Sequence, residues 1–481
     1  MAPLIPVNNK QKTKIIATIG PASSGKEALL DLVRAGVNVF RLNFSHGAHA
    51  QHQEVIDRIL EINEKYNLHI GILADLQGPK LRVGKIENNA LDIEPGDILT
   101  FVNQECIGNR DKIYMSYDHF AQDVKPGEKV LVDDGKIVLQ VVSTNQKDEV
   151  KLKVLFGSVL SSNKGVNLPE TVVSQPSLTP KDIEDLEYIL TQPVNWIALS
   201  FVRQAKDIRD LQKKIAEKNH FAKVIAKIEK PEAINNIKEI IKVSDAIMIA
   251  RGDLGVEFPI EKLPGIQKMI ISRCIQKSKP VIVATQMMES MITNPSPTRA
   301  EVTDVANAVL DGTDAVMLSG ETSVGNHPSL VVDAMRKIIT EAEKHYHMQG
   351  KRVQPVPESE TFLSDVLCLG APRIAEEVHA KAILGLTVNG YTAFRMSSYR
   401  PKPKIYIFSD KPHMLNTLSL VWGIKCYLYT KFTTTDETFE DLNQILKDEG
   451  VVKQGDIVIN TGSMPLYKKF RTNMLKITII E

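Results

Sequence analysis

The stretch KVIAKIEKPEAINNIKEIIKVSDAIMIARG, residues 223–252, carries the pattern that decides the fold. An apolar run (223–229) is followed by a polar turn, a segment with helical periodicity and a second apolar run (245–252). Short apolar runs separated by helical segments are typical of parallel βα units. The stretch therefore predicts two parallel strands joined by a helix.

The same pattern recurs on both sides of this stretch. Six further runs are KIIATIG (14–20), VNVFRLNF (37–44), HIGILADL (69–76), VNWIALSF (194–201), KPVIVATQ (279–286) and DAVMLSGE (314–321). Together the eight runs predict an α/β fold whose centre is a (β/α)₈ barrel, because eight parallel units close naturally into one.

Two further domains are predicted beside the barrel. From residue 80 to 165 the helical period disappears and the turn signals EPGD, KPGE and VDDG separate short strand-like segments, so we expect an inserted β-barrel lid domain. Apolar runs alternate with helical segments again over 351–481, which predicts a C-terminal α/β domain. The barrel then comprises residues 1–79 and 166–350.

Composition restricts the class of protein. The chain has 481 residues, of which 43% are hydrophobic and 24% charged, as in soluble multidomain enzymes. Lys plus Arg (59) nearly balances Asp plus Glu (58), so we expect neither a nucleic-acid nor a membrane partner. Four dispersed cysteines and the lack of a signal-like or membrane-spanning apolar run favour a cytoplasmic protein.

Polar side chains follow most of the predicted strands, at the end where barrels of this kind carry their chemistry. Arg41, Asn43 and Ser45 alternate along one face of the second strand, and Lys227 and Glu229 do so on the fifth. The other strand ends contribute Asp75, Arg251, Gly252, Asp253, Thr285, Gln286, Ser319 and Glu321. Converging strand ends predict one polar pocket.

The residue types in this pocket favour phosphoryl transfer. Glu229 and Asp253 offer the hard oxygen ligands that Mg²⁺ prefers, with Mn²⁺ as an alternative. Arg41 and Lys227 are cations suited to phosphate. Any one of these residues alone could be a structural ion pair, but polar groups at most of the eight strand ends favour a catalytic site.

A P-loop is the rival interpretation of residues 20–27, GPASSGKE. This segment has Glu27 where the pattern requires a Ser or Thr hydroxyl, and a carboxylate there would repel the phosphates. We predict instead that Ser24 and Glu27 form a capping box for the next helix.

Seven segments closely resemble the signature segments of pyruvate kinases, in order: TKIIATIGP (13–21), RLNFSHG (41–47), KGVNLP (164–169), KIEKPEAINN (227–236), IMIARGDLG (247–255), VIVATQMMESM (281–291) and AVMLSGETSVGNHP (315–328). The resemblance implies a homotetrameric enzyme of glycolysis that transfers the phosphoryl group of phosphoenolpyruvate to ADP, giving pyruvate and ATP.

The resemblance also implies roles for individual residues. Lys227 would stabilise the transferring phosphoryl group and the enolate oxygen, Arg41 would contact the phosphate, and Thr285 would orient the water that protonates carbon. Glu229 and Asp253 would hold the divalent metal. The substrate carboxylate would bind at the backbone amides of Arg251 and Gly252. ADP would lie between barrel and lid, with contacts from Pro21, Asn43, His46, Arg82 and Lys164.

A departure from the family pattern concerns the monovalent cation. Members that need K⁺ bind it through groups matching Asn43, Ser45, Asp75 and the carbonyl of residue 76, and carry Thr and Glu where this chain has Leu76 and Lys80. We expect that K⁺ is not required, since the Lys80 ammonium would supply the charge.

Some alternatives stay open at this stage. A phosphoenolpyruvate or 2-oxoacid lyase would explain Glu229 and Asp253 but not the lid, and a non-catalytic barrel would not need Lys227. Effector-binding family members use the C-terminal domain, where Thr387, Asn389 and Thr392 are candidate phosphate donors and Lys468, Lys469 and Arg471 candidate anchors. The sequence assigns no effector.

Overall fold

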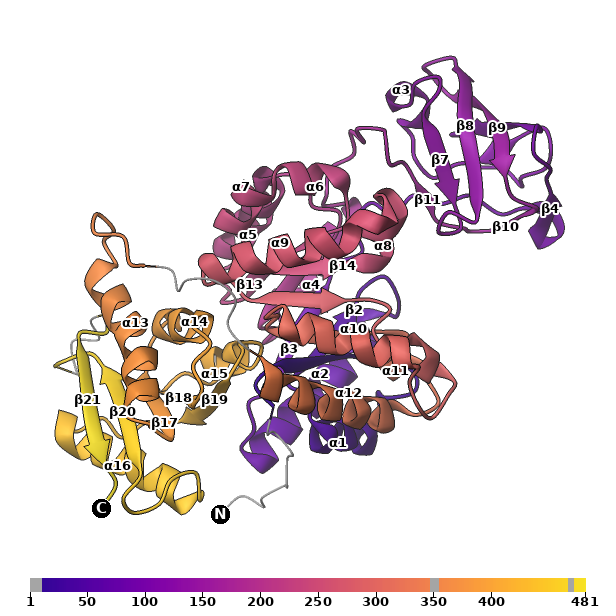
Figure 1. The fold of residues 1–481 in the computed structure, drawn as a ribbon. Coiled ribbons are helices and arrows are strands. Elements are labelled where there is room, and N and C mark those ends of the chain that lie inside the picture. Colours follow the sequence, from indigo (N-terminus) through magenta and orange to yellow (C-terminus); the bar gives the residue numbers. More distant parts are fainter. Residues whose placement is uncertain (1–10, 347–353, 466–470) are drawn as a thin grey trace.

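The protein is described by a computed structural model that covers residues 11–346, 354–465 and 471–481. Eight parallel strands close into a barrel in the order β1-β16-β15-β14-β13-β12-β3-β2 (Figure 1). Their bounds are β1 (Lys14–Thr18), β2 (Val39–Asn43), β3 (Gly71–Asp75), β12 (Trp196–Leu199), β13 (Lys223–Ile228), β14 (Ala246–Ala250), β15 (Val281–Ala284) and β16 (Ala315–Leu318). Each lies inside one predicted run, so the predicted barrel is confirmed.

Helices cover the outside of the barrel, and side chains of the strands fill its inside. The strands are therefore buried on both faces, which explains why they are almost continuously apolar. They are α1 (Lys26–Ala35), α2 (His49–Tyr66), α4 (Pro180–Ile189), α5 (Ala205–Glu217), α6 (Pro231–Asn235), α7 (Ile237–Val243), α8 (Arg251–Glu257), α9 (Leu263–Gln276), α10 (Arg299–Leu310), α11 (Gly320–Ser323) and α12 (Pro328–Ala342). None of the helices in the described ranges is long and apolar enough to cross a membrane.

The predicted capping box at the start of α1 is wrong. The helix begins at Lys26 with Gly25 as its N-cap, and no side chain caps it. Ser24 lies in the preceding turn, where its N–H donates to the carbonyl of Gly20 over 2.9 Å. The turn therefore ends one residue later than the capping pattern requires.

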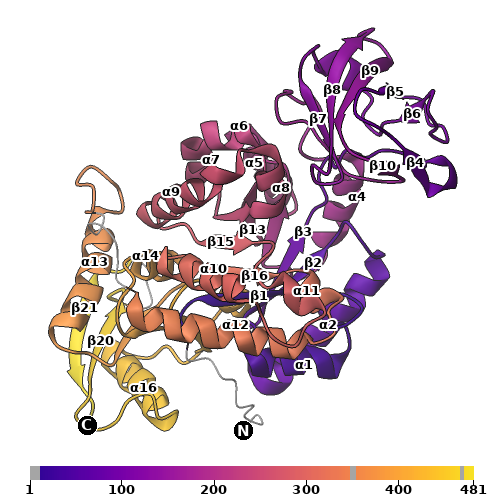
Figure 2. The same ribbon diagram turned by 45° about the vertical axis from the view of Figure 1, so that its right-hand side comes forward.

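The inserted domain projects from the barrel (Figure 2). Its main sheet has the order β11-β7-β8-β9-β5-β6, and β10 pairs with β4. Its elements are β4 (Ala90–Asp92), β5 (Ile98–Val102), β6 (Ile113–Tyr114), α3 (Phe120–Asp123), β7 (Lys129–Val132), β8 (Ile137–Thr144), β9 (Glu149–Phe156), β10 (Val159–Ser161) and β11 (Val166–Asn167). Strand β11 pairs with β7, and Leu168 and Val173 pack in the same core, so this unit continues beyond residue 165.

The C-terminal domain has a five-stranded sheet in the order β19-β18-β17-β20-β21. Its elements are α13 (Phe362–Glu377), β17 (Ala382–Leu386), α14 (Tyr391–Ser398), β18 (Lys404–Ser409), α15 (Pro412–Leu418), β19 (Ile424–Leu428), α16 (Thr435–Asp448), β20 (Ile457–Gly462) and β21 (Met474–Ile479). The boundary expected at residue 350 lies outside the described residues.

The C-terminal domain closes one end of the barrel. Arg400 pairs with Asp314 over 2.9 Å, the indole of Trp196 donates to the carbonyl of Thr417 over 3.1 Å, and Leu420 joins the core inside the barrel. Asp314 and Trp196 stand at the amino ends of their strands, so the carboxyl ends face the lid.

Candidate active site

Charged side chains from three strands meet at the carboxyl end of the barrel. The Nζ of Lys227 on β13 lies 3.0 Å from Oε1 of Glu229, at the end of the same strand. Arg41 on β2 donates from Nε to Oδ2 of Asp75 on β3 over 2.7 Å. All four side chains are buried or nearly so. The predicted convergence of these strand ends is therefore present.

Burial disfavours the charged forms of Lys227 and Asp75, but for both the attraction of neighbouring opposite charges is stronger. The carboxylates of Asp75 and Glu229 raise the pKa of Lys227 above its ordinary value despite its burial. Burial likewise works against ionised Asp75, yet Lys227 and Arg41 lower the pKa of its carboxyl group. Lys227 is consequently a fixed cation at neutral pH, not a proton donor.

Glu229 and Asp253 form the candidate metal site. Burial raises the pKa of Glu229, and although Lys227 lowers it, the nearby charge of Asp253 raises it further. The second oxygen of Glu229 accepts the N–H of Phe201 over 2.7 Å. A hard divalent cation would stabilise the ionised form of Glu229 that burial and Asp253 disfavour, so the two carboxylates fit Mg²⁺.

No cluster of three or more His, Cys, Asp or Glu side chains suited to a metal occurs within residues 11–346, 354–465 and 471–481. Mg²⁺ commonly binds through one or two carboxylates and completes its shell with water and substrate oxygens. A pair of carboxylates therefore suits a substrate-bridging ion better than a structural one.

Thr285 follows β15 in a strained conformation. Its φ is +68°, a region that β-branched residues rarely adopt. The hydroxyl donates to the carbonyl of Ala284 over 2.6 Å and accepts the N–H of Gly252 over 2.7 Å. Thr285 is thereby held against the first turn of α8, the helix that carries Asp253.

The side chain of Arg251 has a structural role. Its guanidinium donates to Asp304 over 2.7 Å and to the carbonyl of Thr285 over 2.9 Å. It holds α10 and the loop after β15 together, so only its backbone amide remains for the expected contact with substrate.

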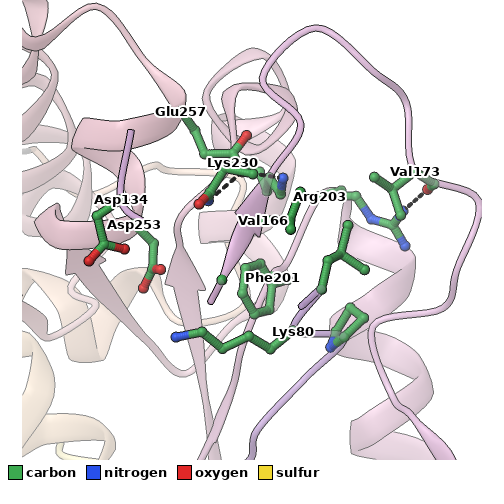
Figure 3. Close-up of a pocket in the computed structure, with 13 residues that line it drawn as sticks. Lys80, Asp134, Val166, Val173, Phe201, Arg203, Lys230, Asp253 and Glu257 are labelled. Atoms are coloured by element: carbon green, nitrogen blue, oxygen red, sulfur yellow. Dashed lines mark hydrogen bonds and ion pairs between the residues drawn. The ribbon is translucent and has the colours of Figure 1, made fainter. Parts of the chain in front are cut away.

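A pocket of about 30 Å³ lies between the barrel and the base of the lid. Figure 3 shows Asp253 and Glu257 of α8, Lys80 at the start of the lid and Asp134 of the lid around it. This volume admits one or two waters and is too small for a nucleotide.

The five residues expected to bind nucleotide fall into two groups. Pro21, Asn43 and His46 lie in or beside the loops that follow β1 and β2. In the lid, Arg82 donates to the carbonyl of Asn163 over 3.0 Å, and Lys164 pairs with Asp133 over 3.0 Å. In the part of the chain that the structure describes, no hydrogen bond or ion pair joins the two groups.

The groups expected to hold a monovalent cation already have internal partners. Oδ1 of Asn43 accepts the N–H of Ser45 over 3.2 Å, and the carbonyl of Leu76 accepts the Ser200 hydroxyl over 2.7 Å. Asp75 is paired with Arg41, as above. Lys80 is exposed, and within the described residues the ion pairs of Asp75 are with Arg41 and Lys227, not with Lys80.

Sequence reasoning missed two hydroxyls that position the charged groups. Ser200 accepts from Nζ of Lys227 over 2.7 Å, and Thr18 accepts from Nη1 of Arg41 over 2.9 Å. Both belong to predicted strand runs and stand near their carboxyl ends, so the rule that found Asp75 could have found them.

In the C-terminal domain, Thr387, Asn389, Thr392 and Arg471 line a pocket of about 280 Å³. Tyr391 and Phe432 add aromatic walls. The proposed anchors Lys468 and Lys469 lie outside the described residues.

A (β/α)₈ barrel whose carboxyl end joins two cations to paired carboxylates beneath a β-rich lid defines a barrel enzyme built for phosphoryl transfer. Family models agree: the barrel domain of pyruvate kinase matches residues 10–332 and its alpha/beta domain residues 365–478. The chain belongs to the pyruvate kinase family and is a phosphotransferase.

Individual relatives support this assignment. Pyruvate kinase 2 of Synechocystis sp. is 42% identical over 98% of this chain and 80% of its own length. The pyruvate kinase of Corynebacterium glutamicum is 40% identical over 98% of both chains. The crystal structure of a pyruvate kinase from Cryptosporidium parvum superposes with a TM-score of 0.90 at 34% identity, covering 98% of this chain and 96% of that one.

Proposed function

We propose that this chain transfers the phosphoryl group of phosphoenolpyruvate to ADP in a reaction that depends on Mg²⁺ and not on K⁺. The observation that carries the proposal is the contact of Lys227 with both Asp75 and Glu229. It keeps one buried ammonium charged beside a pair of carboxylates, an arrangement suited to neutralising phosphate and enolate oxygens.

Glu229 and Asp253 would hold Mg²⁺, or Mn²⁺ in its place. When bound, the ion supplies positive charge to the phosphoryl and enolate oxygens. Lys227 stabilises the same negative charge from the protein side, and its raised pKa keeps it protonated throughout. Arg41 binds the phosphate with a guanidinium that Asp75 already orients.

Thr285 positions the proton donor. The N–H of Gly252 bonds its hydroxyl over 2.7 Å. A substrate carboxylate that accepts the amides of Arg251 and Gly252 would release this hydroxyl to hold a water against the enolate carbon. Substrate binding and placement of the donor water are thereby linked through one hydrogen bond.

ADP would bind between the barrel group Pro21, Asn43 and His46 and the lid group Arg82 and Lys164. Approach of the lid would bring the groups together and exclude water from the transfer. K⁺ independence is supported by the internal partners of Asn43 and Leu76, and Lys80 would supply the missing charge. We also propose that the protein is cytoplasmic and forms a homotetramer; light scattering of the purified protein tests the tetramer.

The experiment is pyruvate release from phosphoenolpyruvate plus ADP, with Mg²⁺, K⁺ and ADP withheld in turn and tetramethylammonium as the buffer cation. We expect release to need Mg²⁺ and ADP and to be unchanged without K⁺. Absence of release in the complete mixture would contradict the proposal, and release without ADP would indicate transfer of the phosphoryl group to water, a phosphatase activity.

A further inference from the structure

One of the contacts between the lid and the barrel is made by a buried carboxylate. Oε1 of Glu257, on α8, accepts from Nδ2 of Asn167 over 2.8 Å and from Nζ of Lys230 over 2.5 Å (Figure 3 draws the contact to Lys230). All three residues are buried. We propose that Asn167, Glu257 and Lys230 form a latch that sets the affinity of the divalent-metal site according to the position of the lid; the inference rests on the proposed metal ligands.

The latch moves with the lid on one side. Asn167 belongs to β11, which pairs with β7 inside the lid sheet, where Asn167 stands opposite Leu131. The lid also approaches α8 at the turn between β7 and β8. A Cβ placed on Gly135 in that turn would lie 4.0 Å from the side chain of Val256 on α8. Any rotation of the lid therefore shifts the donor that Asn167 presents to Glu257.

On the barrel side, Lys230 and Glu257 are each close in sequence to one of the candidate metal ligands. Lys230 directly follows Glu229. Glu257 follows Asp253 by four residues on α8, about one turn of helix. A displacement at the latch is thus transmitted to both carboxylates of the candidate metal site.

Because all three side chains are buried, breaking one of their contacts is costly in free energy. Breaking a buried ion pair leaves an uncompensated charge, so Lys230 and Glu257 stay together when the lid moves. The other carboxylate oxygen, Oε2 of Glu257, is buried and has no hydrogen-bond partner in the described ranges. Only Oε1 fixes the carboxylate, and loss of the Asn167 contact leaves Lys230 as its one anchor.

Coupling of this kind is reciprocal and commonly changes affinity by about 5-fold to 150-fold. We therefore expect Asn167→Ala and Glu257→Gln to weaken Mn²⁺ binding by at least about 5-fold. Saturating Mg²⁺ should restore kcat in both single variants, because they alter affinity and leave the reacting groups in place.

The test is Mn²⁺ titration of the substrate-free full-length protein, with free Mn²⁺ measured by electron paramagnetic resonance. Glu229→Gln defines loss of the site. Lys223→Met is the matched control, because it breaks the 3.2 Å ion pair with Asp245 at the opposite end of β13 and should leave affinity unchanged.

The outcomes separate the two proposals. Wild-type Mn²⁺ binding with unchanged affinity in Asn167→Ala and Glu257→Gln overturns the latch alone. No Mn²⁺ binding by the wild-type protein overturns the metal site and the latch together. If Glu257→Gln fails to fold, Asn167→Ala decides the question, because it removes a contact of the lid and leaves the buried ion pair intact.

Discussion

Nζ of Lys227 on β13 lies 3.2 Å from Oδ1 of Asp75 on β3, although β12 separates the two strands in the barrel. The contact spans the open end of the barrel and joins Lys227 to the residue that orients Arg41. A single carboxylate thereby fixes two cations, one beside the metal ligands and one beside the expected phosphate. Asp75 therefore fixes the positions of Lys227 and Arg41 relative to each other.

Glu229→Gln tests the metal ligand. The amide removes one negative charge from the pair with Asp253, so the hold on the divalent ion weakens. We expect kcat/KM for phosphoenolpyruvate to fall by about 10²-fold or more, with a higher Mg²⁺ concentration for half-activation. Steady-state assays over a Mg²⁺ series measure both. A variant with the Mg²⁺ dependence of the wild-type protein would rule Glu229 out as a ligand.

Thr285 is tested by two substitutions. Thr285→Ala removes the hydroxyl that accepts the N–H of Gly252. We expect kcat to fall by about 10²-fold, because a positioned proton-transfer group contributes about that much to the rate. Thr285→Ser keeps the hydroxyl and should retain most of kcat. Exchange of pyruvate methyl protons with deuterated water, followed by NMR, isolates the protonation step. Equal rates in both variants would exclude a role for the hydroxyl.

Lys80→Glu tests the source of monovalent charge. Replacing the ammonium by a carboxylate should make turnover depend on K⁺, with activation of at least about 10-fold, or about 1.4 kcal/mol. The wild-type protein should show none. Lys85→Glu, at another exposed lysine of the chain, is the control and should stay independent of K⁺. Strong K⁺ activation of the wild-type protein would contradict the assignment.

Lys14 predicts a pH dependence of stability. Burial lowers its pKa to about 8, below the value in the unfolded chain. The unfolded state therefore binds more protons above pH 8, and folding stability rises with pH in that range. Relative to Lys14→Met, the wild-type protein should gain on the order of 1 kcal/mol between pH 7 and pH 9. Urea unfolding at both values measures this, and a constant difference would refute it.

The strands of the barrel could be predicted because burial on both faces makes each one a compact apolar run. The same regularity exposed the site, since Arg41, Asp75 and Lys227 are polar residues where an apolar run ends. These signals are local in sequence. They can be recognised without knowing how the rest of the chain folds.

The contacts that the sequence did not reveal depend on how separate units dock. Asn167 and Glu257 are 90 positions apart, and their hydrogen bond follows from the placement of the lid on α8. Nothing in the periodicity near either residue indicates it. The guanidinium of Arg251 is similar, because its ion pair with Asp304 depends on where α10 packs.

The incorrect prediction at Ser24 has a local cause. A capping pattern specifies side-chain chemistry, but the Gly20–Ser24 turn fixes the backbone first and shifts the helix start to Lys26. Sequence spacing alone does not distinguish two adjacent starting positions.

The most direct test of the account is Lys227→Met. We measure pyruvate release from phosphoenolpyruvate and ADP at saturating Mg²⁺, with circular dichroism to check the fold and Lys223→Met as the control on the same strand. Loss of the fixed cation should reduce kcat by at least about 10²-fold while the barrel stays folded, since Arg41 still pairs with Asp75. A folded Lys227→Met protein with wild-type turnover would contradict the account.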